Sequence, residues 1–472
     1  MPEKKESKKT RQLRKRLFRD HTRCWDSLGQ DERKQVFDYA QRYRDFLNKA
    51  RTERTTVRFL VDSVVKQGFC DLNTETSGSR RVFEVFRGKF LALAVLGKRP
   101  MTEGVRIITS HVDSPRLDLK PNPLYEDSGL ALLKTHYYGG IKKYHWVARS
   151  LGLCGTVVRS DGSVLSIEIG FEPDDPVLTI PDLLPHLSKK LMDQKASEFI
   201  PGENLNLVVA GIPYEDKEAT DRVKLAVLEL LDRKYRISEE DFVGADIEIV
   251  PAEPARDSGF DRSLIAAYGQ DDRVCAYTSF TALMETVEPE HSAIAVFYDK
   301  EEIGSEGNTS AKSKVLEMFL MDLMHVSGAE PSTRNLHSCC FNSKALCADV
   351  AAALDPTYSD VYEKRNCAQL GYGISLTKYT GHGGKYMASE ANAEYVSWVR
   401  KLFNENGIVW QAGDLGKIDE GGGGTVAKYL ANSGMEILDC GPAVLGMHSP
   451  LELSSKDDIW MCHKAFKVFF GS

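Results

Sequence analysis

Residues 293–302 have the sequence AIAVFYDKEE, in which a continuous apolar run ends in a group of charged residues. Such a run is typical of a strand that is buried on both faces of a parallel sheet. Two adjacent glutamates at the end of a buried strand are costly unless a cation or a proton neutralises them. One of Glu301 and Glu302 could bind a divalent metal while the other acts as a general base on metal-bound water. The stretch therefore predicts a buried strand that leads into a metal-dependent site.

The segments around this strand alternate between helical and strand-like patterns, which indicates an α/β fold. We expect a parallel or mixed sheet that is flanked by helices on both faces. The expected helices span residues 31–49, 55–67, 272–285, 309–324, 391–405 and 425–431, and the expected strands lie within 82–95, 105–110, 293–298, 345–350 and 409–412.

The region between residues 117 and 259 interrupts this alternation. Its short β-type runs are separated by turn residues, and Asp161-Gly162 is a hairpin signal. Strands are expected at 135–138, 155–159, 164–171, 177–180, 206–210 and 246–250, and a helix at 216–235. We therefore expect a basic N-terminal arm at 1–25, an α/β catalytic domain at 26–116 and 260–472, and a β-rich insertion domain at 117–259.

The composition restricts the class of protein. The chain has 472 residues, of which 42% are hydrophobic and 27% charged, so it is long enough for two domains. Its mean hydropathy is −0.32, and we expect no membrane-spanning helix because no apolar run reaches about 18 residues. A net charge of −7 argues against general affinity for nucleic acid or anionic membranes. The ten cysteines form no C-x-x-C motif, and no secretory signal is recognisable, so we expect reduced thiols in the cytoplasm.

The N-terminal arm departs from this acidic balance. We interpret it as a solvated basic arm or a partly helical extension, with a nucleic-acid tail or an address signal as the alternative. Its basic residues are Lys4, Lys5, Lys8, Lys9, Arg11, Arg14, Lys15, Arg16, Arg19 and Arg23.

Acidic residues and histidines follow several of the expected strands, where open α/β sheets bind their ligands. His111 could offer a ring nitrogen to a metal while Asp113 holds the other ring nitrogen. Imidazole nitrogens together with carboxylates suit zinc, with manganese or cobalt as alternatives. Taken singly, these residues also have ordinary structural roles, such as helix capping by Asp272 or a core position for His448. The full set is His111, Asp113, Asp271, Asp272, Glu301, Glu302, Asp349 and His448.

Six sequence motifs extend this set and occur in the order found in one known family. The chain resembles the aspartyl aminopeptidase / aminopeptidase I family of dinuclear zinc metallopeptidases, in its bacterial aminopeptidase I branch, from about Asp31 to the C-terminus. These motifs are His111-Val112-Asp113-Ser114-Pro115, Gly259-Phe260-Asp261-Arg262-Ser263, Gly269-Gln270-Asp271-Asp272-Arg273, Asp299-Lys300-Glu301-Glu302-Ile303-Gly304-Ser305, Ala348-Asp349-Val350 and Gly446-Met447-His448-Ser449.

The resemblance implies a zinc-exopeptidase-like fold and a role for each residue of the set. His111 and Asp349 would bind one metal, Glu302 and His448 the other, and Asp271 both. Glu301 would be the general base and Asp113 would orient His111, whereas Asp272 is not assigned as a ligand. A hydroxide held between the two metals would attack the peptide carbonyl and release the N-terminal residue of a short peptide. The insertion domain would cap the site and form a homo-oligomer, which in this family is a dodecamer.

The resemblance leaves the substrate contacts open. Lys378, Lys385 and His382 lie in a loop that in acidic-specific members carries a basic residue, so the N-terminal residue could be acidic or neutral and leucine-like. Asp419 and Glu420 could neutralise the substrate α-amine. His186, in the insertion, either reaches a neighbouring subunit's active site or is an ordinary core or surface histidine. The family's histidine shortly after the Asp349 position is absent, because residues 351–353 are alanines.

Other functions compete with this hypothesis. An N-acyl amino acid deacylase would use the same two-metal site. A non-enzymatic assembly or a nucleic-acid binder with a basic tail is the third alternative, and the complete ligand set argues against the non-enzymatic assembly.

Overall fold

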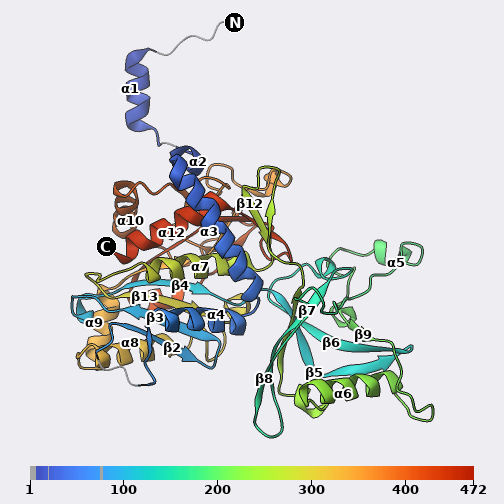
Figure 1. Cartoon of the computed structure of the whole chain (residues 1–472). Coiled ribbons are helices and arrows are strands. Elements are labelled where there is room, and N and C mark those ends of the chain that lie inside the picture. The colour runs from blue at the N-terminus through green and yellow to red at the C-terminus, as the bar shows by residue number, and fades with distance from the viewer. Residues whose placement is uncertain (1–6, 20, 75–77) are drawn as a thin grey trace, which may run out of the picture.

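The computed structural model describes residues 7–19, 21–74 and 78–472, whose largest sheets have nine and six strands. Figure 1 shows the two sheets side by side, with helices gathered around the larger one. The nine-stranded sheet has the order β1-β2-β3-β13-β4-β14-β20-β16-β18. Its strands are β1 (Cys70–Asp71), β2 (Arg81–Phe86), β3 (Phe90–Val95), β4 (Arg106–His111), β13 (Ala293–Tyr298), β14 (Lys344–Ala348), β16 (Ile374–Thr377), β18 (Trp410–Ala412) and β20 (Glu436–Gly441).

The centre of this sheet is parallel and its flanks are mixed. β4 pairs in parallel with both β13 and β14, and β14 pairs in parallel with β20. β3 and β16 join this parallel centre as antiparallel neighbours. The prediction of a mixed sheet is therefore confirmed.

Helices cover both faces of the nine-stranded sheet, and two apolar cores fill the space between. β13 is buried at all six positions. Ala295 and Phe297 contribute to one core, and Ile294 and Val296 to the other, which explains why the run is apolar without alternation. The first core includes residues of α3 (Gln30–Lys49), α4 (Glu53–Lys66), α7 (Gln270–Met284), α10 (Ala393–Glu405) and α12 (Lys456–Phe470), and the second those of α8 (Val315–Val326), α9 (Thr333–Asn342) and α11 (Ala427–Asn432).

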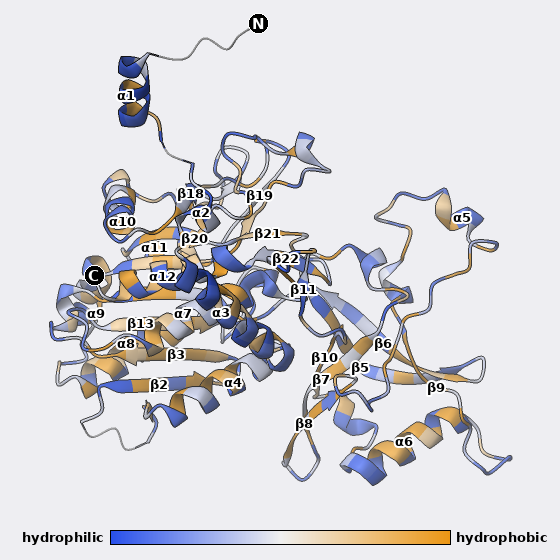
Figure 2. Cartoon of the chain, turned by 45° about the horizontal axis from the view of Figure 1, so that its top comes forward, coloured by the Kyte–Doolittle hydropathy of each residue, from blue (hydrophilic) through white to orange (hydrophobic). Residues whose placement is uncertain are grey.

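The six-stranded sheet is antiparallel throughout and has the order β8-β7-β10-β5-β6-β9. Helix α6 (Arg222–Tyr235) contacts β5 and β6 of this sheet. Figure 2 shows apolar residues on the helix and on the sheet. Its strands are β5 (Arg116–Asp127), β6 (Leu130–Tyr138), β7 (Leu151–Val158), β8 (Val164–Ile169), β9 (Leu207–Ala210) and β10 (Asp246–Pro251).

Two parts of this region differ from the expected pattern. β5 was not predicted, because its polar and proline-containing centre hides the alternation, and its pairing with β6 shifts register between Leu119 and Leu124. The expected strand at 177–180 makes only isolated bridges, from Leu178 and Thr179.

The remaining strands form two small sheets. A five-stranded sheet has the order β11-β12-β22-β21-β15, and β17 pairs with β19. These strands are β11 (Arg256–Ser258), β12 (Leu264–Ala267), β15 (Ala351–Ala352), β17 (Gly381–His382), β19 (Gly422–Gly423), β21 (Ala443–Leu445) and β22 (Glu452–Ser455). Two short α-helices are α2 (Cys24–Ser27) and α5 (Lys189–Met192). Short 3-10 helices span Met101–Glu103, Lys143–His145, Gly202–Asn204, Glu240–Phe242, Glu301–Ile303 and Ser359–Val361.

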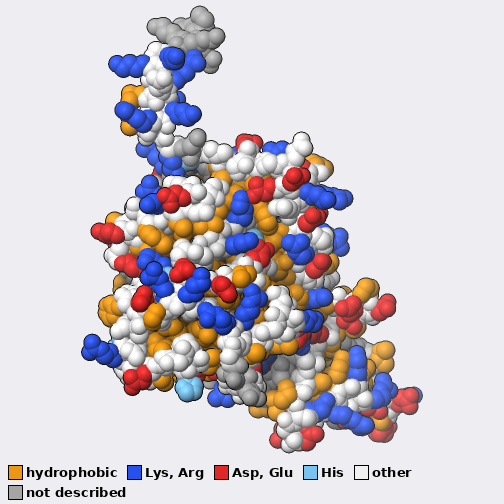
Figure 3. Space-filling view, turned by 60° about the vertical axis from the view of Figure 1, so that its left-hand side comes forward, with side chains coloured by type: hydrophobic (Ala, Val, Ile, Leu, Met, Phe, Trp, Pro, Cys, Tyr) orange, Lys and Arg blue, Asp and Glu red, His pale blue; other side chains and the backbone are white. Residues whose placement is uncertain are grey.

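Most of the described part of the basic arm is helix α1 (Lys8–Leu17), which has no buried residue. In Figure 3 it projects from the body of the molecule and carries many lysine and arginine side chains. Lys4 and Lys5, which belong to the predicted arm, lie outside the described residues. None of the described helices combines the length and the apolar character needed to cross a membrane. All ten cysteines are unpaired, and nine are buried.

Candidate active site

The candidate residues come from the ends of adjacent strands of the large sheet. His111 is the last residue of β4, Glu301 and Glu302 form the turn after β13, and Asp349 follows β14 directly. Since these three strands are parallel, their carboxyl ends share one edge of the sheet. The register pairs His111 with Tyr298, three residues before Glu301. Asp271 comes from the first turn of α7, and His448 follows β21.

The Asp271 carboxylate lies between the two histidines. Its Oδ1 is 3.2 Å from Nε2 of His111, and its Oδ2 is 3.3 Å from Nε2 of His448. The same His448 nitrogen is 3.4 Å from Oε2 of Glu302. One carboxylate that faces an imidazole with each of its oxygens is suited to hold two cations at once.

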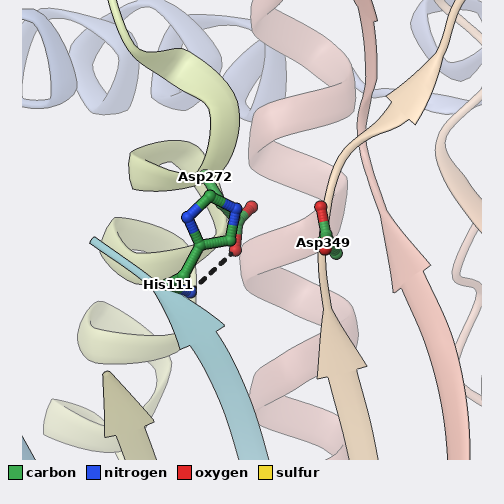
Figure 4. Close-up of side chains that lie close together, drawn as sticks. All are labelled: His111, Asp272 and Asp349. Carbon is green, nitrogen blue, oxygen red and sulfur yellow. Dashed lines mark hydrogen bonds between the residues drawn. The ribbon is translucent and has the colours of Figure 1, made fainter. Parts of the chain in front are cut away.

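A second aspartate, Asp272, lies on the Asp349 side of His111, as Figure 4 shows. His111, Asp272 and Asp349 each offer a ligand atom within 4.8 Å of the others, and so do His111, Asp271 and Glu302. The Oδ2 atom of Asp272 accepts a hydrogen bond of 3.2 Å from the backbone N–H of His111. Asp272 therefore lies at the site, although no ligand role was predicted for it from the sequence.

Asp113 connects the end of β4 to the turn after β13. Its Oδ1 accepts the backbone N–H of Glu301 at 3.1 Å and lies 3.4 Å from Nδ1 of His111. Its Oδ2 accepts the backbone N–H of Glu302 at 3.2 Å and the hydroxyl of Tyr138 at 2.8 Å. Nδ1 of His111 is also 3.0 Å from the Asp113 carbonyl oxygen, so a proton on Nδ1 leaves Nε2 free to bind a metal.

Glu452 is a buried site residue that was not predicted from the sequence. Its carboxylate accepts the backbone N–H groups of Gln270 at 2.6 Å, Asp271 at 3.1 Å and His448 at 2.9 Å. It thereby fixes the backbone of two candidate ligands from the strand β22. Its spacing of four residues from His448 was the only local signal, and that spacing is common in any sequence.

The electrostatics show an excess of buried negative charge. Burial raises the pKa of Glu302 and of Asp349 well above the usual value, and the neighbouring aspartates add to this effect. Burial and the carboxylates of Asp113 and Asp271 raise the pKa of Glu301 to about 7. Although burial opposes it, contacts with Asp271 and Glu302 raise the pKa of His448 to about 10.

The donor set fits a pair of divalent cations. Buried carboxylate oxygens of Asp272 (Oδ1) and Glu302 (Oε1) have no hydrogen-bond partner among the described residues. Crowded carboxylates of this kind are stable as anions only when cations balance them. Two imidazoles among hard oxygen ligands are a donor set typical of zinc.

A cavity of about 430 Å³ opens beside these residues. Beyond the carboxylates and the two histidines its wall includes Val350, Met387, Leu415 and Met447, and one lysine, Lys428.

Among the described residues that line this cavity, none is a predicted substrate-binding residue. Lys378 and Lys385 both contact the carboxylate of Glu390, at 3.4 and 2.9 Å. His382 is exposed on β17. Asp419 and Glu420 are exposed, whereas Asp414 of the same loop does line the cavity. His186 is exposed in the six-stranded-sheet region. Their roles in substrate binding stay predictions.

The sequence of the chain matches one protein family over most of its length. The family model described as aminopeptidase I zinc metalloprotease (M18) matches residues 46–470. A protein of Borrelia garinii subsp. bavariensis named "Probable M18 family aminopeptidase 1" is 47% identical over 451 residues, which cover 94% of this chain and 98% of that protein.

Solved structures agree with this result. The crystal structure of an M18-family aminopeptidase from Thermotoga maritima has a TM-score of 0.92 at 45% identity and covers 96% of this chain and 99% of its own. Aminopeptidase I from Clostridium acetobutylicum has a TM-score of 0.90 at 41% identity, with 97% and 100% covered. A dodecamer structure of an aminopeptidase from Saccharomyces cerevisiae, at 23% identity and a TM-score of 0.74, has the same fold and covers 92% of this chain and 96% of its own. None of these relatives supports the deacylase alternative.

Proposed function

Because this chain belongs to the aminopeptidase I zinc metalloprotease (M18) family, and is an aminopeptidase, we propose that two zinc ions bound at the edge of the large sheet carry its activity. His111 and Asp349 would hold one ion, Glu302 and His448 the other, and Asp271 both. The observation that supports this most directly is the Asp271 carboxylate, with its two oxygens 3.2 and 3.3 Å from the two imidazoles. Asp272 lies within 4.8 Å of ligand atoms of His111 and Asp349, and its Oδ2 accepts a hydrogen bond from the His111 backbone N–H.

Residues of the chain itself then transfer the proton and orient the general base and the histidine ligand. Zinc, when bound, lowers the pKa of a nearby water and polarises the scissile carbonyl. Glu301 accepts a proton from the attacking water and transfers it to the nitrogen of the leaving amine. Glu301 follows β13, directly before the proposed ligand Glu302, and lines the wall of the cavity beside the proposed metal site. Asp113 keeps Glu301 in place through the backbone N–H and keeps the His111 ring in one tautomer.

We propose that the substrate is a short peptide with a free α-amine and a neutral, leucine-like first residue. The apolar residues Val350, Met387 and Leu415 in the cavity wall support a neutral side chain. The contacts of both Lys378 and Lys385 with Glu390 argue against their use for an acidic side chain. Asp414, which lines the cavity, is a candidate partner for the α-amine.

A comparison of three chromogenic substrates tests this function. With zinc-reconstituted protein, we expect cleavage of leucine p-nitroanilide, slower cleavage of aspartate p-nitroanilide, and none of N-acetyl-leucine p-nitroanilide. Cleavage of the acetylated compound alone would overturn the aminopeptidase mechanism. A preference for aspartate would overturn only the proposed side-chain specificity. Metal analysis of the same protein should give two zinc ions per chain.

We also propose that the chain forms a homo-oligomer, with the dodecamer as the expected form. Large apolar side chains are exposed along the six-stranded-sheet region, and burying them between copies would stabilise an assembly. The unpaired cysteines support a reducing, cytoplasmic environment. Sedimentation analysis of the purified protein measures the assembly directly. The exposed residues include Val164, Val177, Leu187, Met192, Ile212, Leu230 and Val243.

A further inference from the structure

Three consecutive residues of the six-stranded-sheet region, Tyr138-Gly139-Gly140, reach the candidate metal centre; we refer to them as the YGG segment. The Tyr138 hydroxyl donates a 2.8 Å hydrogen bond to Asp113, which is fully buried. The carbonyl oxygen of Gly140 is 3.1 Å from Nδ1 of His448. The segment therefore contacts a partner of one candidate histidine ligand and the other histidine itself.

The position of Tyr138 is fixed by its pairing across the sheet. β6 ends at Tyr138, which lies opposite Arg116, the first residue of β5. The Arg116 guanidinium lies 4.0 Å from the centre of the Tyr138 ring. Since β5 begins five positions after His111, the pairing that starts the six-stranded sheet also brings the tyrosine hydroxyl to Asp113.

Arg116 is itself held firmly. Its side chain is 6% exposed and lies 3.3 Å from the buried Glu53 of α4 and 3.5 Å from the buried Glu248 of β10. It also donates to Asp118 at 2.8 Å. A buried cation with several carboxylate partners is costly to displace, so Arg116 provides a rigid support for the tyrosine ring.

The two glycines allow the segment to approach closely. A Cβ atom on Gly140 would lie 3.2 Å from Nδ1 of His448, and one on Gly139 would lie 3.3 Å from Cβ of Glu302. Gly139 also has a φ of +73°, a backbone angle that residues other than glycine adopt only at a cost in free energy. A side chain at either position would push its neighbour away by a few tenths of an ångström, so glycines suit the contact between the Gly140 carbonyl and the His448 ring.

We infer that the YGG segment positions both histidine ligands: Tyr138 acts on His111 through Asp113, and Gly140 acts on His448 directly. This role rests on the proposed two-metal site. A hydrogen bond to the outer nitrogen of a metal-binding imidazole fixes its tautomer and its orientation, and loss of such a partner costs about 10- to 100-fold in metal affinity or activity. The six-stranded sheet is thus a structural part of the metal centre within a single chain, in addition to any role in assembly.

Tyr138→Phe is the first test, because it removes only the hydroxyl. We expect about 10- to 100-fold weaker zinc retention, measured by competition with a chromogenic chelator, and a lower kcat with little change in KM. Tyr137→Phe is the matched control, since this neighbouring tyrosine is 45% exposed and successive strand residues point to opposite faces of a sheet. Chelator competition by Tyr138→Phe that matches the wild type would overturn the inference for His111.

An Asp113→Asn background separates positioning from general destabilisation. If Tyr138 acts through Asp113, adding Tyr138→Phe to Asp113→Asn should weaken zinc retention by less than about twofold more. Equal losses in both backgrounds would show that the tyrosine acts by another route and would overturn the inference. Thermal unfolding of the metal-free variants shows whether the fold is retained. The double-mutant comparison uses the change in zinc retention caused by Tyr138→Phe in each background, so a loss of stability that is common to both backgrounds cancels.

Gly140→Ala tests the second histidine independently. The added methyl group should displace the His448 ring and weaken one of the two metal sites, seen as a change in the absorption spectrum of cobalt bound to the apoprotein. Gly244→Ala is its control, because nothing lies within 4 Å of a Cβ at that position. A spectrum identical to wild type would overturn the role of Gly140. If the wild-type protein itself binds fewer than two metals, the proposed function fails, whereas normal wild-type binding with unaffected variants sinks only this inference.

Discussion

The two large sheets of this molecule place their apolar residues in opposite ways. In the nine-stranded sheet, β13 is buried at every position between two cores. In the six-stranded sheet, the outer strand β8 is buried at one of its six positions, and Val164 at its start is 70% exposed. A strand that is packed on both faces holds its carboxyl end rigidly, which suits catalytic carboxylates. A half-covered sheet keeps apolar surface available for other contacts.

The sheets also differ in how they treat buried charge. At the ends of the large sheet's strands, carboxylates gather with few cations, and burial raises the pKa of Glu302 and Asp349. At the junction with the smaller sheet, Arg116 and Lys89 lie beside Glu53, and their attraction lowers the pKa of that carboxyl group although burial opposes it. At the joint the cations balance only part of the buried charge, because burial raises the pKa of Glu248 beside Arg116 well above the usual value. The reactive site has fewer basic partners still, which is typical of a functional site.

The largest expected effect concerns the reactive side of this comparison. Glu301→Gln should lower kcat by about 10²- to 10⁴-fold, because an amide cannot accept the proton of the attacking water. Zinc content should stay at the wild-type level, since Glu301 is not a proposed ligand. Glu306→Gln, five residues on and exposed, is the control and should keep full activity. Normal turnover by Glu301→Gln would show that another group is the base.

The sequence predicted the fold of the large sheet well, because its strands and helices are long and strongly patterned. The expected helix at 31–49 and strand at 293–298 agree with α3 and β13. The C-terminal helix α12 was not predicted, because eleven of its fifteen residues are buried and these include charged residues such as Asp457 and Asp458, which obscure the apolar stripe. β20 was also missed, since its short run contains a buried aspartate, Asp439.

The candidate site was predictable where residues follow strands, and not where they depend on packing across the molecule. His111 and Asp349 end or follow recognisable strands, so their common edge could be inferred from sequence. The contact of Tyr138 with Asp113 depends on the pairing of β5 with β6, and β5 carries no clear pattern. The pairing of Lys378 with Glu390 likewise depends on how the loop folds back.

The second largest effect tests the buried strand itself. Phe297→Ala should lower the free energy of unfolding by about 3–5 kcal/mol, because Phe297 is fully buried in the first core and its loss leaves a cavity. Denaturant unfolding monitored by circular dichroism measures this change. Phe341→Ala is a suitable control, since that ring is 69% exposed. Equal losses in the free energy of unfolding for both variants would show that burial of Phe297 is not the cause of its effect.

A smaller effect concerns a carboxylate of the large sheet that lies away from the site. Burial, together with Asp322 and Asp71, raises the pKa of Glu84 on β2 to about 7. The folded state therefore binds this proton more tightly than the unfolded state, so its contribution to stability is full below about pH 4.5 and is lost as the pH rises through 7. Glu84→Gln should raise the free energy of unfolding by about 1 kcal/mol at pH 8 and change it little at pH 5. Thermal unfolding at the two pH values checks this, and a stabilisation that is equal at both would rule out titration as the cause.

The smallest expected effect is at the surface of the six-stranded sheet, where two valines of adjacent strands can be changed in the same way. Val164→Thr should alter the free energy of unfolding by less than about 0.5 kcal/mol, because the side chain is 70% exposed and the new hydroxyl stays hydrated. Val157→Thr on β7 should cost about 1–3 kcal/mol, because that residue is fully buried and the hydroxyl would lose its contact with water. Both substitutions conserve shape, so denaturant unfolding of the pair isolates the effect of burial within one sheet. A large loss for Val164→Thr at protein concentrations where the chain is assembled, together with no loss when it is dissociated, would place this strand in a contact between copies.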